Sequence, residues 1–267
     1  MAKTLVQLYR DRCDKEGNPL YWQPRETEAT PFCLYTDINN PVNPEWGVES
    51  ALSKSLCLNK YLEIDGAGFF VGKALKDKKI PDHPILRSLL KSNISDETYH
   101  QQGIEILCSL YPPSNNDDIE AQRIAQRWQK TSELYHPLLP VAMLEIGAFM
   151  VNLAFWRVFG GSTIASAARE IARDENRHAA TNRSLLVHLS QPTSNPYLIE
   201  LTKDTIAWVF EDLKIPQCVT PGFMWTVDNL VNASVELVET GEARSLSEVC
   251  KFGDYFAHFE SDAGYSR

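Results

Sequence analysis

One apolar segment constrains the fold of this chain more than any other part of the sequence. Residues 139–159, LPVAMLEIGAFMVNLAFWRVF, are apolar on nearly every side of a helix. Such a helix lies either in the centre of a protein or in a membrane. Glu145, Asn152 and Arg157 interrupt the run, which favours a buried core helix over a membrane span. An unpaired carboxylate in an apolar core is costly, so Glu145 requires a partner.

The rest of the sequence predicts further helices around this segment. Apolar residues recur at helical spacing, and no alternating Val/Ile/Thr runs are bounded by hairpin turns. We therefore expect an all-α fold, a four-helix bundle with additional C-terminal helices. The expected helices cover residues 45–69, 85–110, 117–134, 139–159 and 163–188, with shorter ones near 195–213, 222–239 and 245–258.

The ends of the chain differ from this helical domain. Residues 1–44 are rich in Pro, Asn and Thr, which predicts an irregular N-terminal arm. The helical domain then covers residues 45–258. Residues 259–267 have too little apolar periodicity for a packed helix, so we interpret them as a C-terminal tail.

Composition excludes several classes of function. The chain has 267 residues and a formal net charge of −9, with no Lys/Arg-rich run, so nucleic acid and anionic membranes are not expected partners. The N-terminal residues lack the apolar stretch of a signal peptide, and we expect a soluble, cytoplasmic protein. The six cysteines are scattered without metal-binding spacing, which is typical of reduced thiols.

Two of the expected helices carry a Glu-x-x-His pair. Glu97 and His100 lie in "DETYH", and Glu175 and His178 lie in "DENRH". Residues three apart share one face of a helix, and Glu145 precedes Glu175 by 30 residues, which suits two helices joined by a tight turn. Two such pairs and one acid from each of two further helices form the dinuclear carboxylate centre of four-helix bundles.

Charge and ligand type predict what this centre binds. Four carboxylates carry −4 and two divalent ions carry +4, so a core with both is neutral. Oxygen and imidazole ligands suit iron or manganese better than structural zinc. We therefore expect two metal ions per chain, iron and/or manganese.

Not every Glu-x-x-His pair belongs to such a site. Taken alone, each pair is more often a solvated helix face, and it is the buried Glu145 that favours a metal site. A third pair, Glu133 and His136, lies beside Pro137 at a helix end, and we expect it to take no part.

The acid from the first helix has two candidates, Glu63 and Asp65 in "YLEIDGAGF". At 3.6 residues per turn, Asp65 shares its face with apolar residues, among them Phe69, whereas Glu63 shares its face with Asn59 and Lys60. An apolar face points into a bundle, which favours Asp65. The predicted ligands are Asp65, Glu97, His100, Glu145, Glu175 and His178.

Several of these segments resemble the ribonucleotide reductase small (β) subunit family, and the resemblance implies a ferritin-like bundle. "EIGAFMVNLAFWRVFGG" and "EIARDENRH" look like its third and fourth core helices, and "IARDENRH" is nearly the family's signature for the fourth. "IDGAG" resembles the first-ligand segment, which supports Asp65. The likeness covers about residues 20 to 190. Only 48 residues separate Glu97 from Glu145, fewer than is typical of the family, so this chain is a reduced version.

The resemblance also implies a path for an oxidising equivalent. "LYWQPRE" matches the segment that supplies the radical-transfer tryptophan of the family, here Trp22. By the same match, Asp174 joins Trp22 to the metal-bound His100. The C-terminal tail of the family docks on the catalytic subunit and carries a tyrosine, here Tyr265, with Tyr255 as second candidate.

One residue departs from the family pattern. The family places a radical-forming tyrosine four residues after the histidine of the second helix, where this chain has Ile104. Because isoleucine cannot be oxidised, the resemblance then implies an oxidant held on the metals. Tyr61 and Tyr99 are the candidates to replace the missing radical tyrosine. The structural alternative for Tyr61 is a core aromatic residue, and the alternative for Tyr99 is a side chain that points away from the metals.

These features lead to one main hypothesis and two alternatives. The main one is the radical-generating small subunit of an aerobic ribonucleotide reductase, a homodimer that acts on a separate catalytic (α) subunit. A self-contained dinuclear-metal oxidase or oxygenase would need a substrate channel but no partner. A metal-storage bundle would form a shell and would not need the Trp22 arm.

Overall fold

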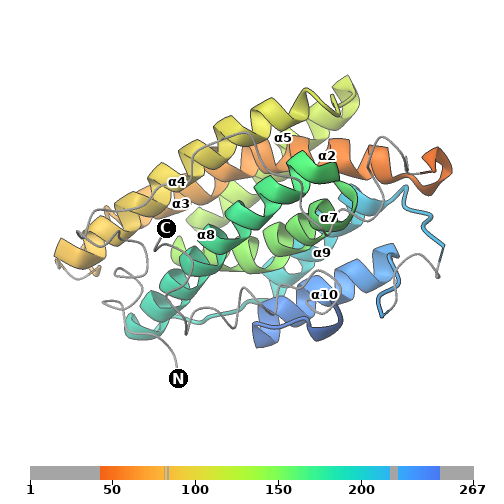
Figure 1. Ribbon diagram of the computed structural model, residues 1–267. Helices are drawn as coiled ribbons and strands as arrows, with labels where there is room; N and C mark the ends of the chain where they lie inside the picture. The colour runs from red at the N-terminus through yellow and green to blue at the C-terminus, as the bar shows by residue number, and fades with distance from the viewer. Residues whose placement is uncertain (1–42, 81, 83, 217–221, 247–267) are drawn as a thin grey trace, which may run out of the picture.

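The computed structural model describes residues 43–80, 82, 84–216 and 222–246. These residues are helical, with no strand among them (Figure 1), so the predicted all-α class is confirmed. Trp22 and Tyr265 lie outside the described residues, as do Tyr255, the N-terminal arm up to residue 42 and the C-terminal tail.

Four long helical stretches carry the predicted ligands. The first joins α2 (Val48–Leu62), the π-helical η2 (Glu63–Gly68) and α3 (Phe69–Ala74), and the second is α4 (Pro84–Cys108). The third joins α6 (Leu138–Met143), the π-helical η4 (Leu144–Phe149) and α7 (Met150–Phe159), and the fourth is α8 (Gly161–His188). The remaining elements are η1 (Pro44–Trp46), α5 (Asn115–Lys130), η3 (Thr131–Glu133), α9 (Pro196–Phe210) and α10 (Val227–Thr240).

The four stretches surround a common interior (Figure 1). The second packs along the first, the fourth packs along the third, α4 contacts α8, and α2 contacts α7. α5 packs outside α2, while α9 and α10 pack together and both contact η4. Each stretch therefore has one side toward the interior, where the ligand side chains meet.

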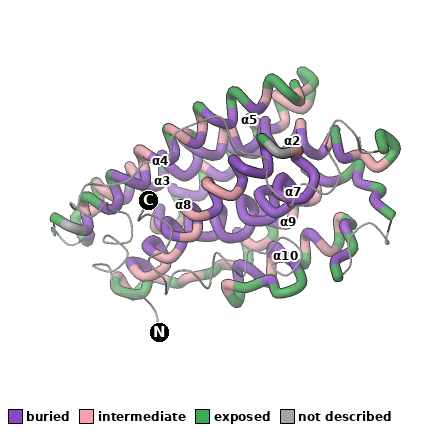
Figure 2. Tube along the Cα trace, viewed as in Figure 1, coloured by how far each residue is buried: buried purple, intermediate pink, exposed green. Residues whose placement is uncertain are grey.

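The apolar segment identified in the sequence forms the core. Leu138–Phe159 is long and apolar enough to cross a membrane, but it is fully buried inside the structure (Figure 2). Phe155 packs on Phe210 and on Trp225, with ring centroids 4.9 and 5.9 Å apart. Because neighbouring helices cover every side of it, this segment is the central helix of a fold compatible with a soluble protein.

The polar residues of the core segment are matched by polar groups from its neighbours. Asn152 Nδ2 donates to Asn59 Oδ1 at 2.9 Å, and Trp156 Nε1 donates to Ser55 Oγ at 2.7 Å. Both acceptors lie on α2. A buried polar group is costly without a hydrogen-bond partner, so these bonds help to fix the position of α2 against α7.

Gly147 allows α9 and α10 to approach η4. A Cβ atom at this position would lie 2.7 Å from Val238 Cγ2 and 2.9 Å from Thr202 Cγ2. Both neighbours are β-branched and have little rotamer freedom. Glycine is therefore required here by packing.

Gly147→Ala should destabilise the protein by about 1–3 kcal/mol, because the added methyl overpacks this contact. Urea unfolding measures the change. Gly72→Ala is the matched control: its Cβ would have Ile94 Cδ1 as nearest neighbour, at 3.9 Å, and the helical position should gain up to about 1 kcal/mol. Equal unfolding midpoints for the two variants would contradict the packing argument.

Candidate metal centre

Six buried side chains from the four stretches meet in the interior. They form two overlapping groups. Within each group the ligand atoms all lie within 4.8 Å of one another, and each group could hold a metal ion. Glu97 and Glu175 belong to both groups. Glu63 and His100 complete the first group, and Glu145 and His178 complete the second.

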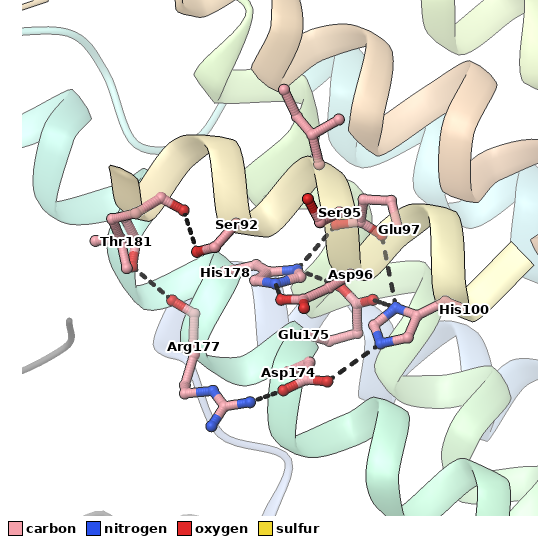
Figure 3. Close-up of polar contacts among 12 residues, drawn as sticks. Ser92, Ser95, Asp96, Glu97, His100, Asp174, Glu175, Arg177, His178 and Thr181 are labelled. Atoms are coloured by element: carbon pink, nitrogen blue, oxygen red, sulfur yellow. Dashed lines mark hydrogen bonds and ion pairs between the residues drawn. The ribbon is translucent and has the colours of Figure 1, made fainter. Parts of the chain in front are cut away.

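The imidazole of His100 faces the acids of the first group. Its Nδ1 lies 3.1 Å from Glu175 Oε1, 3.3 Å from Glu63 Oε2 and 3.7 Å from Glu97 Oε2. His178 is placed in the same way, with Nδ1 2.9 Å from Glu97 Oε1 and 3.6 Å from Glu175 Oε2. Both histidines therefore direct the same ring nitrogen to the interior (Figure 3).

Two aspartates hold the histidines from behind, each reaching across to the other helix. Asp174 on α8 places Oδ2 3.3 Å from Nε2 of His100 on α4. Asp96 on α4 places Oδ2 2.9 Å from Nε2 of His178 on α8 (Figure 3). An Nε2–H that donates to a carboxylate leaves Nδ1 with its lone pair toward the acids, as a metal ligand requires.

Asp174 has a second contact. It forms an ion pair with Arg177, one turn along α8, and both side chains are almost completely buried. The position of Asp174 behind His100 agrees with the position that the family resemblance implied. Trp22, which the same resemblance links to Asp174, lies outside the described residues.

The carboxylate oxygens of the cluster fit a bound cation. Both carboxylate oxygens of Glu97 and of Glu175, and Oε1 of Glu63, are buried and accept no hydrogen bond of ordinary geometry within the described part of the chain. Four ionised glutamates would carry −4, and two protonated imidazoles would offset only half of this charge. Two divalent ions with neutral imidazoles would offset all of it.

Burial and the neighbouring charges of the cluster shift the pKa of several of its side chains. Burial raises the pKa of Glu63 well above its ordinary value, and burial together with the nearby Glu175 does the same for Glu145. Burial alone would lower the pKa of both histidines, but the surrounding carboxylates outweigh it and raise the pKa of His100 and His178. Without metal, the cluster therefore holds protons where a cation would otherwise lie.

Both acids that lack a paired histidine lie at the start of a π-helical segment. Glu63 is the first residue of η2, and Glu145 is the second residue of η4. A π-helical turn has a wider hydrogen-bonding pattern than an α-helix and often occurs at functional sites. In η2, the side chain of Gln129 on α5 donates a hydrogen bond to the backbone carbonyl of Asp65. This bond gives η2 support from a neighbouring helix.

The preference for Asp65 over Glu63 was wrong. Glu63 is fully buried in the cluster, whereas Asp65 is exposed. The apolar-face argument failed because α2 is buried on nearly all sides: Asn59, assigned to the polar face, is buried and bonded to Asn152. Phe69, assigned to the inner face with Asp65, is 40% exposed. The π-helical segment also breaks the regular period that the argument assumed.

The structure also places the remaining residues named in the sequence. Glu133 is exposed and His136 Nε2 lies 3.3 Å from Asp77, so this third pair is separate from the cluster. Ile104 is fully buried one turn beyond His100. Tyr61 is half-buried between α2 and α5, where its hydroxyl donates to Asp118 at 2.7 Å.

Sequence reasoning missed two residues of the site. Asp96 was not proposed although the pattern Asp-Glu-x-x-His occurs twice, as "DETYH" and "DENRH". The repetition could have assigned Asp96 the same role as Asp174. Asn182, whose amide contacts Glu145, has no motif in the sequence and required the structure.

Comparison with known proteins gives no family model, no curated protein and no solved structure that matches this chain.

Glu63→Gln and Asp65→Asn test the corrected assignment of the first-helix ligand. Both changes replace a carboxylate by an amide of nearly the same shape. Glu63→Gln should lower the metal content per chain after reconstitution, because an amide is a weaker ligand and adds no charge. Asp65→Asn should leave the content unchanged, as measured by elemental analysis. Loss of metal in Asp65→Asn alone would restore the original assignment.

Metal loading should stabilise the protein more at pH 8 than at pH 6. Groups whose pKa is raised in the folded state stabilise it fully below their unfolded pKa, about 4.3 for Glu and 6.5 for His, and less as pH rises toward the folded pKa. Glu63, Glu145, His100 and His178 all follow this sign. A bound metal replaces these protons, so its advantage grows with pH.

Anaerobic melting curves with and without Mn²⁺ at both pH values measure this difference. At a free ion concentration about 100 times the dissociation constant, binding should add about 2.7 kcal/mol. A metal-induced rise in melting temperature that is larger at pH 6 would contradict the proposed exchange of protons for metal.

Proposed function

We propose that this protein is a dinuclear-metal oxidoreductase of the ferritin-like type. The observation that carries the proposal is the pair of overlapping ligand groups, which share Glu97 and Glu175 and take one more Glu and one His each. Four glutamates and two histidines from four helices are the ligand set of di-iron and di-manganese carboxylate proteins. Such a metal pair supplies one-electron redox chemistry and open positions for dioxygen or a reduced oxygen species.

The residues of this chain have defined tasks in that proposal. Glu97 and Glu175 belong to both groups and would contribute to both metal positions, whereas Glu63 and Glu145 would each contribute to one. Asp96 and Asp174 hold the imidazoles of His178 and His100 in the orientation that binding requires. The apolar core around Glu145 excludes water from the centre.

The specific role that we propose is the radical-generating small subunit of an aerobic ribonucleotide reductase. The motifs "IARDENRH" and "LYWQPRE" support it, and so does the contact of Asp174 with His100. In this role, His100, Asp174 and Trp22 carry an oxidising equivalent away from the centre, and Tyr265 passes it to a separate catalytic (α) subunit. The protein would act as a homodimer in the cytoplasm.

Ile104 determines where the oxidising equivalent is held in this proposal. Its buried side chain lies one turn beyond His100 and cannot be oxidised. The equivalent therefore stays at the centre, held by iron, manganese or one of each. Tyr61 remains a substitute of a different kind, since its hydroxyl donates to Asp118 and that carboxylate could accept the phenolic proton.

A self-contained oxidase or oxygenase is the second candidate, and one observation favours it. Asp96 holds His178 in the same way that Asp174 holds His100. If the oxidising equivalent leaves the centre only through His100, Asp96 takes no part in its transfer. Two equivalent aspartates are instead what we expect of a centre in which both histidines serve only as metal ligands.

The matched variants Asp174→Asn and Asp96→Asn separate the two candidates. Each weakens the support of one histidine, so both should lower metal affinity by a similar factor, about 10–100-fold. At saturating metal, only Asp174→Asn should abolish nucleotide reduction with a class I catalytic subunit from the source organism, because only Asp174 belongs to the relay.

Electron paramagnetic resonance after oxygen exposure reports whether each variant still forms the oxidant. Normal oxidant formation with no nucleotide reduction in Asp174→Asn is the expected result. Equal nucleotide reduction by both variants would remove Asp174 from the relay. Oxygen consumption without any nucleotide reduction by the unaltered protein would favour the self-contained oxygenase.

A further inference from the structure

We infer that Asn182 is a positioning residue that makes the two metal positions unequal, because it orients Glu145 while no equivalent residue in the described part of the chain orients Glu63. The inference rests on the proposed dinuclear centre and is independent of the ribonucleotide reductase role. The two positions are named here by the glutamate that each does not share. The Glu145 position comprises Glu97, Glu145, Glu175 and His178, and the Glu63 position comprises Glu63, Glu97, His100 and Glu175.

The hydrogen bonds of Asn182 to the cluster go to one glutamate, Glu145. Asn182 lies on α8, one turn beyond His178, and is fully buried. Its Nδ2 donates to Glu145, 3.0 Å from Oε2 and 3.3 Å from Oε1. The amide is neutral, so it restrains the carboxylate without adding charge to the centre.

The corresponding position beside the other histidine has no donor. Ile104 lies one turn beyond His100, as Asn182 lies one turn beyond His178, and its buried side chain cannot form a hydrogen bond. Glu63 Oε2 lies 3.3 Å from His100 Nδ1, while Oε1 accepts no hydrogen bond within the described part of the chain. Glu145 therefore has a donor that is not itself a candidate metal ligand, and among the described residues Glu63 has no such donor.

This difference has a consequence for metal affinity. A ligand held in place by a hydrogen bond loses less conformational freedom when it binds a metal, and removal of such a support typically lowers affinity about 10–100-fold. Glu145 is held in this way and Glu63 is not. The Glu145 position should therefore bind a metal ion first, and the Glu63 position should bind one second.

Two single-position backgrounds make the inference testable. Glu63→Ala leaves all four ligands of the Glu145 position in place, and Glu145→Ala leaves all four ligands of the Glu63 position in place. Asn182→Leu, which keeps the approximate volume but removes the donor, should weaken Mn²⁺ binding about 10–100-fold in the Glu63→Ala background. It should leave binding unchanged in the Glu145→Ala background, because the residue that it supports is already absent.

Calorimetric titration with Mn²⁺ measures each dissociation constant, and melting curves confirm that every variant is folded. Equal weakening in both backgrounds would show a general structural role for Asn182 and would overturn the inference. No weakening in the Glu63→Ala background would overturn it as well. Absence of Mn²⁺ binding by the unaltered protein would instead refute the proposed dinuclear centre.

A titration of the otherwise unaltered chain provides a second readout. At one equivalent of Mn²⁺, the protein with Asn182 should show the paramagnetic resonance signal of an isolated ion, because one position fills before the other. Asn182→Leu should show mixed occupancy and more of the coupled pair at the same ratio. Identical spectra for the two proteins would contradict unequal filling through Asn182.

Discussion

The burial of four glutamates at one point is the constraint on which the rest of the structure depends. Each ionised carboxylate in a dry core is costly without a compensating charge, and here Glu63, Glu97, Glu145 and Glu175 are all fully buried. Burial raises the pKa of Glu63 and Glu145, which favours their neutral forms and lowers this cost in the metal-free chain. Bound cations would let all four glutamates ionise. The charge of the interior can therefore be balanced either by protons or by metal ions.

The helices meet this constraint in two different ways. α4 and α8 remain regular and direct a Glu-x-x-His pair inward, with an aspartate of each helix supporting the histidine of the other. The other two stretches depart from α-helical geometry at their acids, in η2 and η4. A π-helical turn changes the register of all later residues, so the acid can point inward while the following apolar residues keep their own packing. The contact of Gly147 with α9 and α10 depends on this arrangement.

The sequence was sufficient for the helical class and for five of the six residues in the cluster. Glu145 was identifiable because an acid in an apolar helix needs a partner, and the Glu-x-x-His pairs because helical spacing is regular. Glu63 was ranked below Asp65 for the opposite reason. A period of 3.6 residues cannot be applied through a π-helical turn, and a helix that is buried on nearly all sides has no exposed polar face by which a candidate could be excluded. Asn182 could not be found, because contact between residues 37 apart depends on how two helices pack.

The two halves of the centre have nearly the same ligands, so any difference in their chemistry must come from their surroundings. One such difference is present. Asn182 restrains Glu145, whereas the corresponding Ile104 leaves Glu63 without such support. A restrained ligand at one metal position and an unrestrained ligand at the other would let a nearly symmetric ligand set serve a reaction that has a direction.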